Sequence, residues 1–480
     1  MRTWLALAAI LAFAVAPACG DDGSEAQPTA EPTGAAAPAS AGDWPMLGHD
    51  LSSSFRNDAE TAISVENAGE LTEAWTLRAN VYGTPAVVDG RVYVLSRSGT
   101  YALDAKTGEE VWHNPSAGGT SSPAYANGVV YVHDNTGVVR ALDGTSGEEL
   151  WQAASSDHPF AAGFSSPMVA GDLVIVGSSS TEEASATDDA TFRGGVVAFD
   201  RETGAEVWRH YTVEAPHNGV AVWSSVTVDL ELGFVFGSTG NNYTGEASET
   251  SDSIFALELE TGELVWNRQL SEGDVFTIPN PQSEDTDFGT NPLLFKATID
   301  GAERRLAGAG QKSGMFWVLD RETGEVVWSR QISGGSPLIG GVFNNGAFDG
   351  ERIILAGNNA TSDAPGGEPA SGESEPLGGA NVPTSVLMAL DPADGSIVWE
   401  RQLPAWVWAP ITIANGVGFV SAESELQAFN TSTGEKLFSL DAEGTIASGA
   451  AIAGGRVFFG SGLAYFNTTP GDVFRALALP

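Results

Sequence analysis

Residues 102–112 read ALDAKTGEEVW. The same unit recurs along the chain with its small, acidic, glycine and aromatic residues at the same positions. Five further copies end in tryptophan and a worn copy ends in phenylalanine, at residues 141–151, 198–208, 256–266, 318–328, 389–399 and 428–438. Each copy predicts a strand, a turn closed by glycine, and a second strand that ends in a large aromatic residue. Such self-similarity is typical of a repeat architecture, so this unit decides the fold.

Each copy is expected to form the outer half of a blade. Two more strands are predicted upstream of it, as at residues 122–125 and 129–132, and four antiparallel strands make a propeller blade. Lone strands at residues 73–76 and 475–478 supply the two halves of one more blade. The sequence therefore predicts an all-β, eight-bladed propeller in which the N- and C-terminal strands of the repeat region close one blade. This closure leaves no open sheet edge.

The tryptophans of the repeat are expected to pack each blade against the next. They are Trp75, Trp112, Trp151, Trp208, Trp266, Trp328 and Trp399. Because packing explains these side chains, we assign them no chemistry.

Composition excludes several classes of protein. The 480 residues include 22 Lys+Arg and 62 Asp+Glu, a formal net charge of −40, which argues against a nucleic-acid partner. Hydrophobic residues make up 42% of the chain, enough for a large core. The single cysteine, Cys19, excludes a disulfide framework, a cysteine metal cluster and a covalently attached c-type haem.

The first 42 residues are predicted to be a targeting signal followed by a disordered linker. An apolar run follows Arg2 and ends at Ala16-Pro17-Ala18-Cys19, which resembles a bacterial lipoprotein signal with lipid attached to Cys19. The alternative is an ordinary secretory signal; both predict export to the periplasm, and a lipidated Cys19 anchors the protein to a bacterial membrane, inner or outer. We therefore expect a signal peptide at 1–18, a disordered tether at 19–42 and the propeller at 43–480.

One face of the propeller is expected to carry the function. In a four-stranded meander A-B-C-D, the D-to-A and B-to-C connections share one face, which we call the loop face. The predicted connections at residues 179–194, 240–252, 271–289 and 361–383 are long and all belong to it. Long loops on a rigid scaffold are the usual carriers of binding and catalysis.

Five residues of the loop face are candidates for chemistry. Each one taken alone reads equally well as a solvated loop residue. Together they place an aromatic plate, a cation and three oxygen ligands near the axis. Carboxylate and amide oxygens suit a hard cation such as Ca²⁺ better than zinc. The five are Trp223, Lys312, Asp287, Asn241 and Glu182.

The repeat looks like that of the quinoprotein dehydrogenases, eight-bladed enzymes that bind pyrroloquinoline quinone (PQQ). Residues 43–50, DWPMLGHD, resemble the start of the polyvinyl-alcohol dehydrogenase branch of this family. Residues 222–225, VWSS, resemble the segment whose tryptophan stacks under the quinone, which implies that role for Trp223. Residues 239–241, TGN, resemble the segment that supplies a calcium-binding Asn, here Asn241.

The same resemblance implies roles for the charged candidates. Glu182 falls where the family has its calcium-binding Glu, although Glu183 is an alternative. Asp287, in an Asp-Phe-Gly segment, resembles the catalytic base, which also faces the metal. Lys312 resembles the lysine that contacts the quinone oxygens. Lanthanide-using members carry an extra Asp two places after the base, where this chain has Gly289, which favours Ca²⁺.

The chain also departs from the family pattern. Many members cover the upper face of the quinone with a disulfide between adjacent cysteines, which this chain lacks. A common Asn-Trp pair corresponds to Asn344 and Asn345, so Asn345 is the candidate cofactor contact there. Trp406 or Trp408, on a D-to-A loop, is the candidate replacement for the missing cover.

The resemblance implies PQQ- and calcium-dependent oxidation of an alcohol, and the opening segment favours a secondary or polymeric alcohol. Because the sequence has no Cys-x-x-Cys-His segment, we expect an external electron acceptor, either a c-type cytochrome or a quinone. The first alternative is a non-catalytic, lipid-anchored propeller scaffold similar to the outer-membrane protein assembly lipoprotein. The second is a propeller that binds without a cofactor. Neither alternative needs the site residues named above.

Overall fold

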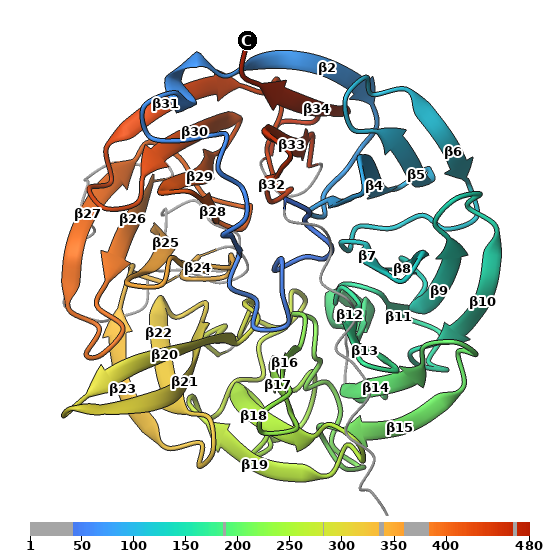
Figure 1. The fold of residues 1–480 in the computed structure, drawn as a ribbon. Coiled ribbons are helices and arrows are strands. Elements are labelled where there is room, and N and C mark those ends of the chain that lie inside the picture. The colour runs from blue at the N-terminus through green and yellow to red at the C-terminus, as the bar shows by residue number, and fades with distance from the viewer. Residues whose placement is uncertain (1–41, 186–188, 282, 336–339, 360–383, 464–467) are drawn as a thin grey trace, which may run out of the picture. The chain divides into compact units, whose positions relative to one another are not determined.

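The computed structural model describes residues 42–185, 189–281, 283–335, 340–359, 384–463 and 468–480. Within them, eight sheets, each built on four antiparallel strands, form the ring of blades seen in Figure 1; two of the sheets gain one short additional strand. The predicted eight-bladed propeller is therefore confirmed. Among the described residues, no helix is both long and apolar enough to cross a bilayer.

The first four blades run, from the axis outwards, in chain order. Their strands are β3 (Ala86–Val88), β4 (Arg91–Ser96), β5 (Gly99–Asp104) and β6 (Glu110–Asn114); β7 (Ala124–Ala126), β8 (Val129–His133), β9 (Val138–Asp143) and β10 (Glu149–Ala154); β12 (Met168–Ala170), β13 (Leu173–Ser180), β14 (Gly195–Asp200) and β15 (Glu206–Tyr211); and β16 (Thr227–Asp229), β17 (Phe234–Ser238), β18 (Ser253–Glu258) and β19 (Leu264–Gln269). The short β11 (Ala161–Ala162) adds to β13.

Blades 5 to 7 repeat this order, and blade 8 combines two distant segments. Their strands are β20 (Leu293–Ile299), β21 (Ala302–Gly310), β22 (Met315–Asp320) and β23 (Val326–Gln331); β24 (Ala347–Phe348), β25 (Ile353–Asn359), β26 (Thr384–Leu390) and β27 (Ile397–Leu403); β28 (Thr412–Ala414), β29 (Val417–Ala422), β30 (Glu425–Asn430) and β31 (Lys436–Asp441); and β32 (Ala451–Ala453), β33 (Arg456–Ser461), β34 (Val473–Ala478) and β2 (Thr72–Arg78). β2 and β34 pair antiparallel, so the predicted split blade is confirmed.

Each repeat tryptophan docks its blade on the turn of the next blade. Trp208 Nε1 donates to the carbonyl oxygen of Leu259 at 2.9 Å. A Cβ atom at Gly262, in the same turn, would lie 2.5 Å from the indole, so the ring rests on a bare glycine. The equivalent pairs are Trp75 and Gly108, Trp112 and Gly147, Trp151 and Gly204, Trp266 and Gly324, Trp328 and Gly395, and Trp399 and Gly434. The predicted packing role is confirmed.

Residues 43–57, which we call the axial segment, lie inside the ring, where Figure 1 shows the start of the blue chain. The segment contains β1 (Arg56–Asn57), which pairs parallel with β28. Its carbonyl oxygens accept backbone N–H groups from the innermost strands of six blades, at 2.7–3.0 Å. The donors are Val87, Tyr125, Val228, Leu294, Phe348 and Ile413. Asn57 Nδ2 reaches a seventh blade by donating to the carbonyl oxygen of Ile452.

The glycine beneath the docking indole is testable. We expect Gly262→Ala to lower the free energy of unfolding by about 1 kcal/mol for left-handed strain and by roughly 1–3 kcal/mol more for overpacking. The matched control is Gly233→Ala, because both glycines have φ +69° but a Cβ at Gly233 meets nothing within 4 Å. Denaturant unfolding measures both. Equal losses in the two variants would mean that the indole contact adds nothing.

Candidate active site

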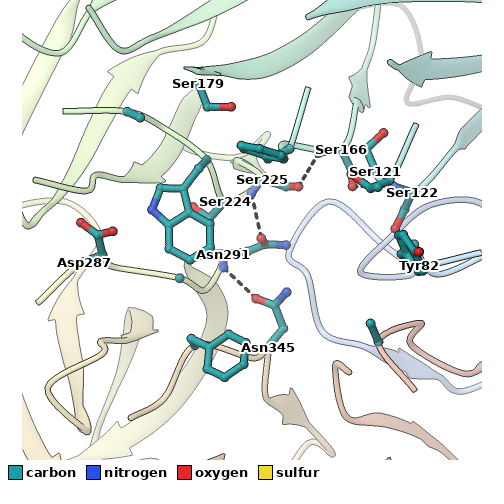
Figure 2. A pocket seen from close by; sticks show the side chains of 18 of the residues that line it. Tyr82, Ser121, Ser122, Ser166, Ser179, Ser224, Ser225, Asp287, Asn291 and Asn345 are labelled. Carbon is teal, nitrogen blue, oxygen red and sulfur yellow. Dashed lines mark hydrogen bonds between the residues drawn. The ribbon is translucent and has the colours of Figure 1, made fainter. Parts of the chain in front are cut away.

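A cavity of about 560 Å³ opens on the loop face. Its lining comes from D-to-A connections such as 121–122, 223–225 and 287–291, and from B-to-C connections such as 179–184. The loop-face prediction therefore holds for the described connections, whereas the predicted loop at 361–383 lies outside them. Part of the cavity lining is drawn in Figure 2.

The floor of the cavity is an arc of hydrogen bonds that runs from blade to blade. At each step, a backbone N–H group donates to a hydroxyl or amide oxygen on the following blade, at 2.7–2.9 Å. Figure 2 shows the last three steps. Because each side chain fixes the preceding blade, the floor is rigid. The residues in order are Thr84, Ser122, Ser166, Ser225, Asn291 and Asn345.

Trp223 forms one wall of this cavity. The indole packs on a small apolar cluster that includes the fully buried Phe192 and Tyr243. At Gly289, a Cβ atom would come within 2.7 Å of the Trp223 ring and 2.8 Å of the Phe343 Cβ. The site therefore has no room for a side chain at Gly289 while Trp223 keeps this position.

Asp287 and Lys312 lie together at the cavity wall and are both buried. Asp287 Oδ1 accepts the backbone N–H of Asn241 at 2.7 Å, and Lys312 Nζ lies 2.9 Å from Asp287 Oδ2. The ammonium nitrogen is 5.4 Å from the centre of the Trp223 ring. Burial by itself lowers the pKa of Lys312, but the charges of Asp285 and Asp287 outweigh it and raise that pKa well above its usual value. The ammonium therefore stays charged.

The structure places the two candidate glutamates differently. Glu182 does not line the cavity: its carboxylate accepts the backbone N–H groups of Thr191 and Phe192, at 3.1 and 2.8 Å, and lies 3.7 Å from His158. A short 3-10 helix, η2 (Glu182–Ser185), follows β13 and turns the next side chain inwards. Glu183, the alternative, lines the cavity.

The remaining predicted residues lie at different depths around the cavity. Asn241 is buried behind it, and its side-chain nitrogen donates to the carbonyl oxygens of Asn242 and Phe276. Asn345 lines the floor through the amide oxygen described above. Trp408 lines the cavity and packs edge-on against Trp406, with ring centres 6.4 Å apart. Cys19 lies outside the described residues.

Three buried acids near Asp287 were not foreseen from the sequence: Asp252, Asp274 and Asp285. Asp252, Asp274 and Asp287 each offer an oxygen within 4.8 Å of the others. The Thr286 hydroxyl lies 3.1 Å from both the Asp252 and the Asp274 carboxylates. Asp285 contacts Lys312 from the other side, at 2.9 Å. Glu183 adds a fifth carboxylate, so acids outnumber the single lysine in this part of the wall.

Burial perturbs several of these acids. Burial, and then the charge of Asp287, raises the pKa of Asp274 from 3.8 to about 7. The same two causes raise the pKa of Glu183 from 4.5 to about 8. Burial and the neighbouring charge of Asp274 raise the pKa of Asp252 well above its usual value. Crowded carboxylates of this kind favour either protons or a hard cation.

Trp223, Lys312 and the surrounding groups fit a flat, anionic cofactor beside a calcium ion. The cavity offers an aromatic plate with a buried ammonium near it. Among the described residues, the indole nitrogens of Trp223 and Trp408 are buried without a hydrogen-bond partner, although both residues line the cavity. Glu183 and Asp287 supply hard oxygen atoms at the same wall.

The chain is similar to known proteins over most of its length. The PQQ_2 family, described as outer membrane protein assembly factor BamB, matches residues 59–330, 193–373 and 318–477. A polyvinylalcohol dehydrogenase of Pseudomonas sp is 31% identical over 452 residues, covering 80% of this chain and 67% of that relative. A quinohemoprotein alcohol dehydrogenase, ADH-IIG of Pseudomonas putida, is 29% identical over 344 residues, or 61% of this chain and 46% of that relative.

Solved structures support the fold. The quinohemoprotein alcohol dehydrogenase ADHIIG from Pseudomonas putida HK5 matches with a TM-score of 0.74 at 21% identity, covering 91% of this chain and 80% of that chain. BamB from Moraxella catarrhalis matches with a TM-score of 0.56 at 15% identity, covering 85% of this chain and 99% of that chain. The scaffold alternative is thus the weaker match.

The class of protein follows: it is a quinoprotein oxidoreductase built on an eight-bladed propeller. Within that class, the chain belongs to the family of PQQ-dependent alcohol dehydrogenases and lies near the polyvinyl alcohol dehydrogenases.

The raised pKa values of Glu183 and Asp274 predict how the stability of the cofactor-free protein changes with pH. An acid whose pKa is higher in the folded state stabilises the protein fully below its unfolded pKa, and this stabilisation is lost as the pH rises through the folded pKa. We therefore expect the unfolding temperature to fall between about pH 4.5 and pH 8. Calcium should restore more stability at the upper end, where the carboxylates are ionised.

Glu183→Gln provides the comparison for this prediction. Because it removes one raised acid, we expect the variant to gain stability relative to the parent at pH 8 and not at pH 4.5. Thermal unfolding followed by circular dichroism, with and without Ca²⁺, measures the difference. Parallel curves for the two proteins would contradict the prediction.

Proposed function

We propose that the protein oxidises a secondary or polymeric alcohol with PQQ and Ca²⁺. The observation that carries this proposal is the convergence of Trp223, Lys312 and Asp287 on one cavity. PQQ, when bound, supplies the carbonyl carbon that accepts hydride from the alcohol. The residues of the chain hold that group, remove a proton and control the charge around it.

Asp287 is the proposed general base. Its carboxylate faces the cavity, and the Asn241 N–H group fixes the orientation of one oxygen. The proton of the alcohol hydroxyl passes to a carboxylate oxygen of Asp287. Lys312 keeps a positive charge beside the site, which stabilises negative charge that develops there. Trp223 provides the plane against which the cofactor is held.

Calcium is the proposed metal, with Glu183 in place of Glu182. Asp287 and Glu183 face the cavity, and the side-chain nitrogen of Asn241 is occupied by backbone carbonyls, which leaves its amide oxygen as the ligand atom. The lack of room at Gly289 supports calcium over a lanthanide, because no additional carboxylate fits at that position. When bound, the ion serves as a Lewis acid.

Large apolar side chains at the cavity favour a polymeric or secondary alcohol. Phe164 and Ile278 line the cavity and are 45% and 37% exposed. This apolar surface is suited to contact the carbon backbone of a bulky alcohol. A small primary alcohol is too short to reach it and gains no binding energy from it. Two relatives that match over most of the chain bear the name polyvinylalcohol dehydrogenase, which supports the same substrate class.

Export, anchoring and electron transfer complete the proposal. The N-terminal pattern supports a periplasmic protein attached to a membrane through lipid on Cys19. The electrons pass to an external acceptor, either a c-type cytochrome or a quinone. The net charge of −40 favours a basic partner, whose association would weaken with salt.

Asp287→Asn tests the base. We expect turnover of the loaded protein to fall by roughly 10²–10⁴-fold, because an amide does not accept the hydroxyl proton. The fold should survive, since Asn is isosteric and the Asn241 N–H group retains an oxygen acceptor. Dye-coupled alcohol oxidation and thermal unfolding measure the two effects. Turnover near that of the parent would mean that another group is the base.

Phe164→Ser combined with Ile278→Ser tests the substrate class. We expect KM to rise for vinyl-alcohol oligomers and to stay unchanged for propan-2-ol, because the lost apolar contacts lie beyond the reacting carbon. Steady-state kinetics over a series of oligomer lengths measures this. A parent protein that oxidises only small primary alcohols would exclude the polymeric class.

A further inference from the structure

Lys312 is held by two carboxylates. Its Nζ atom lies 2.9 Å from Asp285 Oδ1 and 3.0 Å from Asp285 Oδ2, and it lies 2.9 Å from Asp287 Oδ2. The side chains of all three residues are at most 7% exposed. Asp285 thus makes the more extensive contact, with both of its oxygens near the ammonium.

The two aspartates differ in their access to the cavity. Asp287 and Lys312 line it, whereas Asp285 does not. Asp285 therefore makes no direct contact with a molecule in the cavity. Its closest contact with a residue of the cavity wall is the ion pair with Lys312, so the position of the ammonium group is the principal way in which Asp285 affects binding.

Asp287 makes other interactions that weaken its ion pair with Lys312. One oxygen already accepts the Asn241 N–H group, and the proposed function requires the carboxylate to ligate a cation and to take up a proton. A carboxylate that is protonated or metal-bound attracts a nearby ammonium less strongly. Asp285 is proposed neither to ligate the cation nor to accept the proton. It therefore keeps its ion pair with Lys312 while Asp287 takes up a proton or binds the cation.

The local backbone explains why both acids reach the same lysine. Residues 284–287 form no helix or turn, and the contacts of their side chains alternate along the chain. Asp285 and Asp287 therefore face Lys312, whereas the intervening Thr286 faces Asp252 and Asp274. The backbone N–H of Lys312 also donates to the Asp287 carbonyl oxygen, at 3.0 Å, which keeps the two segments in register.

We propose that Asp285 is a positioning residue that fixes the Lys312 ammonium at the cavity wall and thereby leaves Asp287 free to act as base and metal ligand. This inference rests on the proposed function, because the cofactor is the group that Lys312 would meet. It assigns to Asp285 no contact with substrate or cofactor.

The test compares cofactor affinity in four proteins: the parent, Asp285→Asn, Lys312→Met and the double variant. PQQ is titrated into each cofactor-free protein with Ca²⁺ present, and quenching of tryptophan fluorescence reports binding without any turnover. We expect Asp285→Asn to weaken binding by about tenfold or more, since a displaced buried charge costs affinity. In the Lys312→Met background, Asp285→Asn should cause no further loss, because the ammonium group that Asp285 is proposed to position has been removed.

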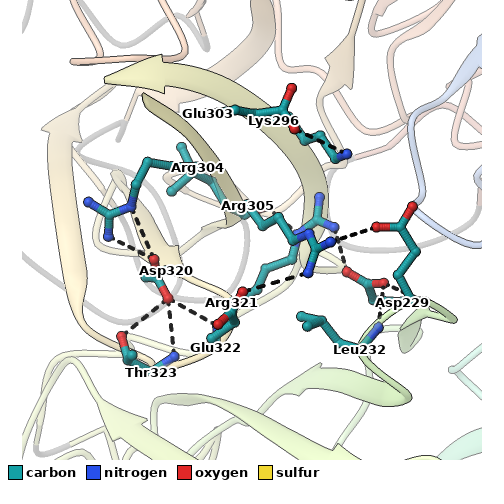
Figure 3. Close-up of polar contacts among 12 residues, drawn as sticks. Asp229, Leu232, Lys296, Glu303, Arg304, Arg305, Asp320, Arg321, Glu322 and Thr323 are labelled. Atoms are coloured by element: carbon teal, nitrogen blue, oxygen red, sulfur yellow. Dashed lines mark hydrogen bonds and ion pairs between the residues drawn. The ribbon is translucent and has the colours of Figure 1, made fainter. Parts of the chain in front are cut away.

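A matched control separates positioning from general destabilisation. Asp229 and Arg321 form another buried ion pair, with Asp229 Oδ2 2.8 Å from an Arg321 guanidinium nitrogen and both side chains at most 7% exposed (Figure 3). Neither residue lines the cavity. Asp229→Asn should lower the unfolding temperature, as Asp285→Asn is expected to do, but leave the affinity for PQQ unchanged.

The possible outcomes are distinct. A parent protein that shows no quenching with PQQ and Ca²⁺ overturns the proposed function, and this inference with it. If the parent binds and Asp285→Asn binds equally well, only this inference is overturned. Equal losses from Asp285→Asn in the parent and Lys312→Met backgrounds would also overturn it, because the effect would then not pass through Lys312.

Discussion

An indole ring resting on a bare glycine is the contact on which the whole propeller depends. The repeat supplies a tryptophan at the end of one blade and a glycine in the turn of the next, so each pair of blades joined in this way makes nearly the same close contact. The indole N–H bond to a backbone carbonyl fixes the rotation of the ring. Because these contacts lie at the outer strands and repeat around the ring, they set the step between blades and bring the loop-face connections to one mouth.

The cavity wall carries a high density of buried charge. Several carboxylates and one ammonium share a wall behind an aromatic plate, where water is largely excluded. Buried acids of like charge are unfavourable alone, and this wall becomes stable only when protons, Lys312 or a divalent ion offset them. A site that is costly without its ligands binds hard cations strongly. The same feature ties the protonation of the wall to the occupation of the site.

The sequence predicts the scaffold better than the site, for a physical reason. Docking residues such as Trp208 and Gly262 recur together in all copies but the one at 428–438, which ends in Phe438, so the fold is encoded many times. Site residues occur once and depend on one local turn: the 3-10 helix after β13 directs Glu182 to backbone N–H groups and Glu183 to the cavity. Asp285 was visible in principle, since the sequence Asp-Thr-Asp places a second acid two positions before the predicted base, and both acids contact Lys312. Asp252 and Asp274 carry no such signal, because only the packing of two loops brings them to Asp287.

The axial segment changes how a repeat protein of this kind holds together. Blades that contact only their neighbours gain stability locally, and such arrays are able to melt in parts. Here one short stretch of backbone bonds to the innermost strands of six blades. Release of that stretch removes hydrogen-bond acceptors from six blades at the same time, so the unfolding of these blades is coupled. The protein is thus expected to unfold as one cooperative unit with a high barrier to opening, and not blade by blade.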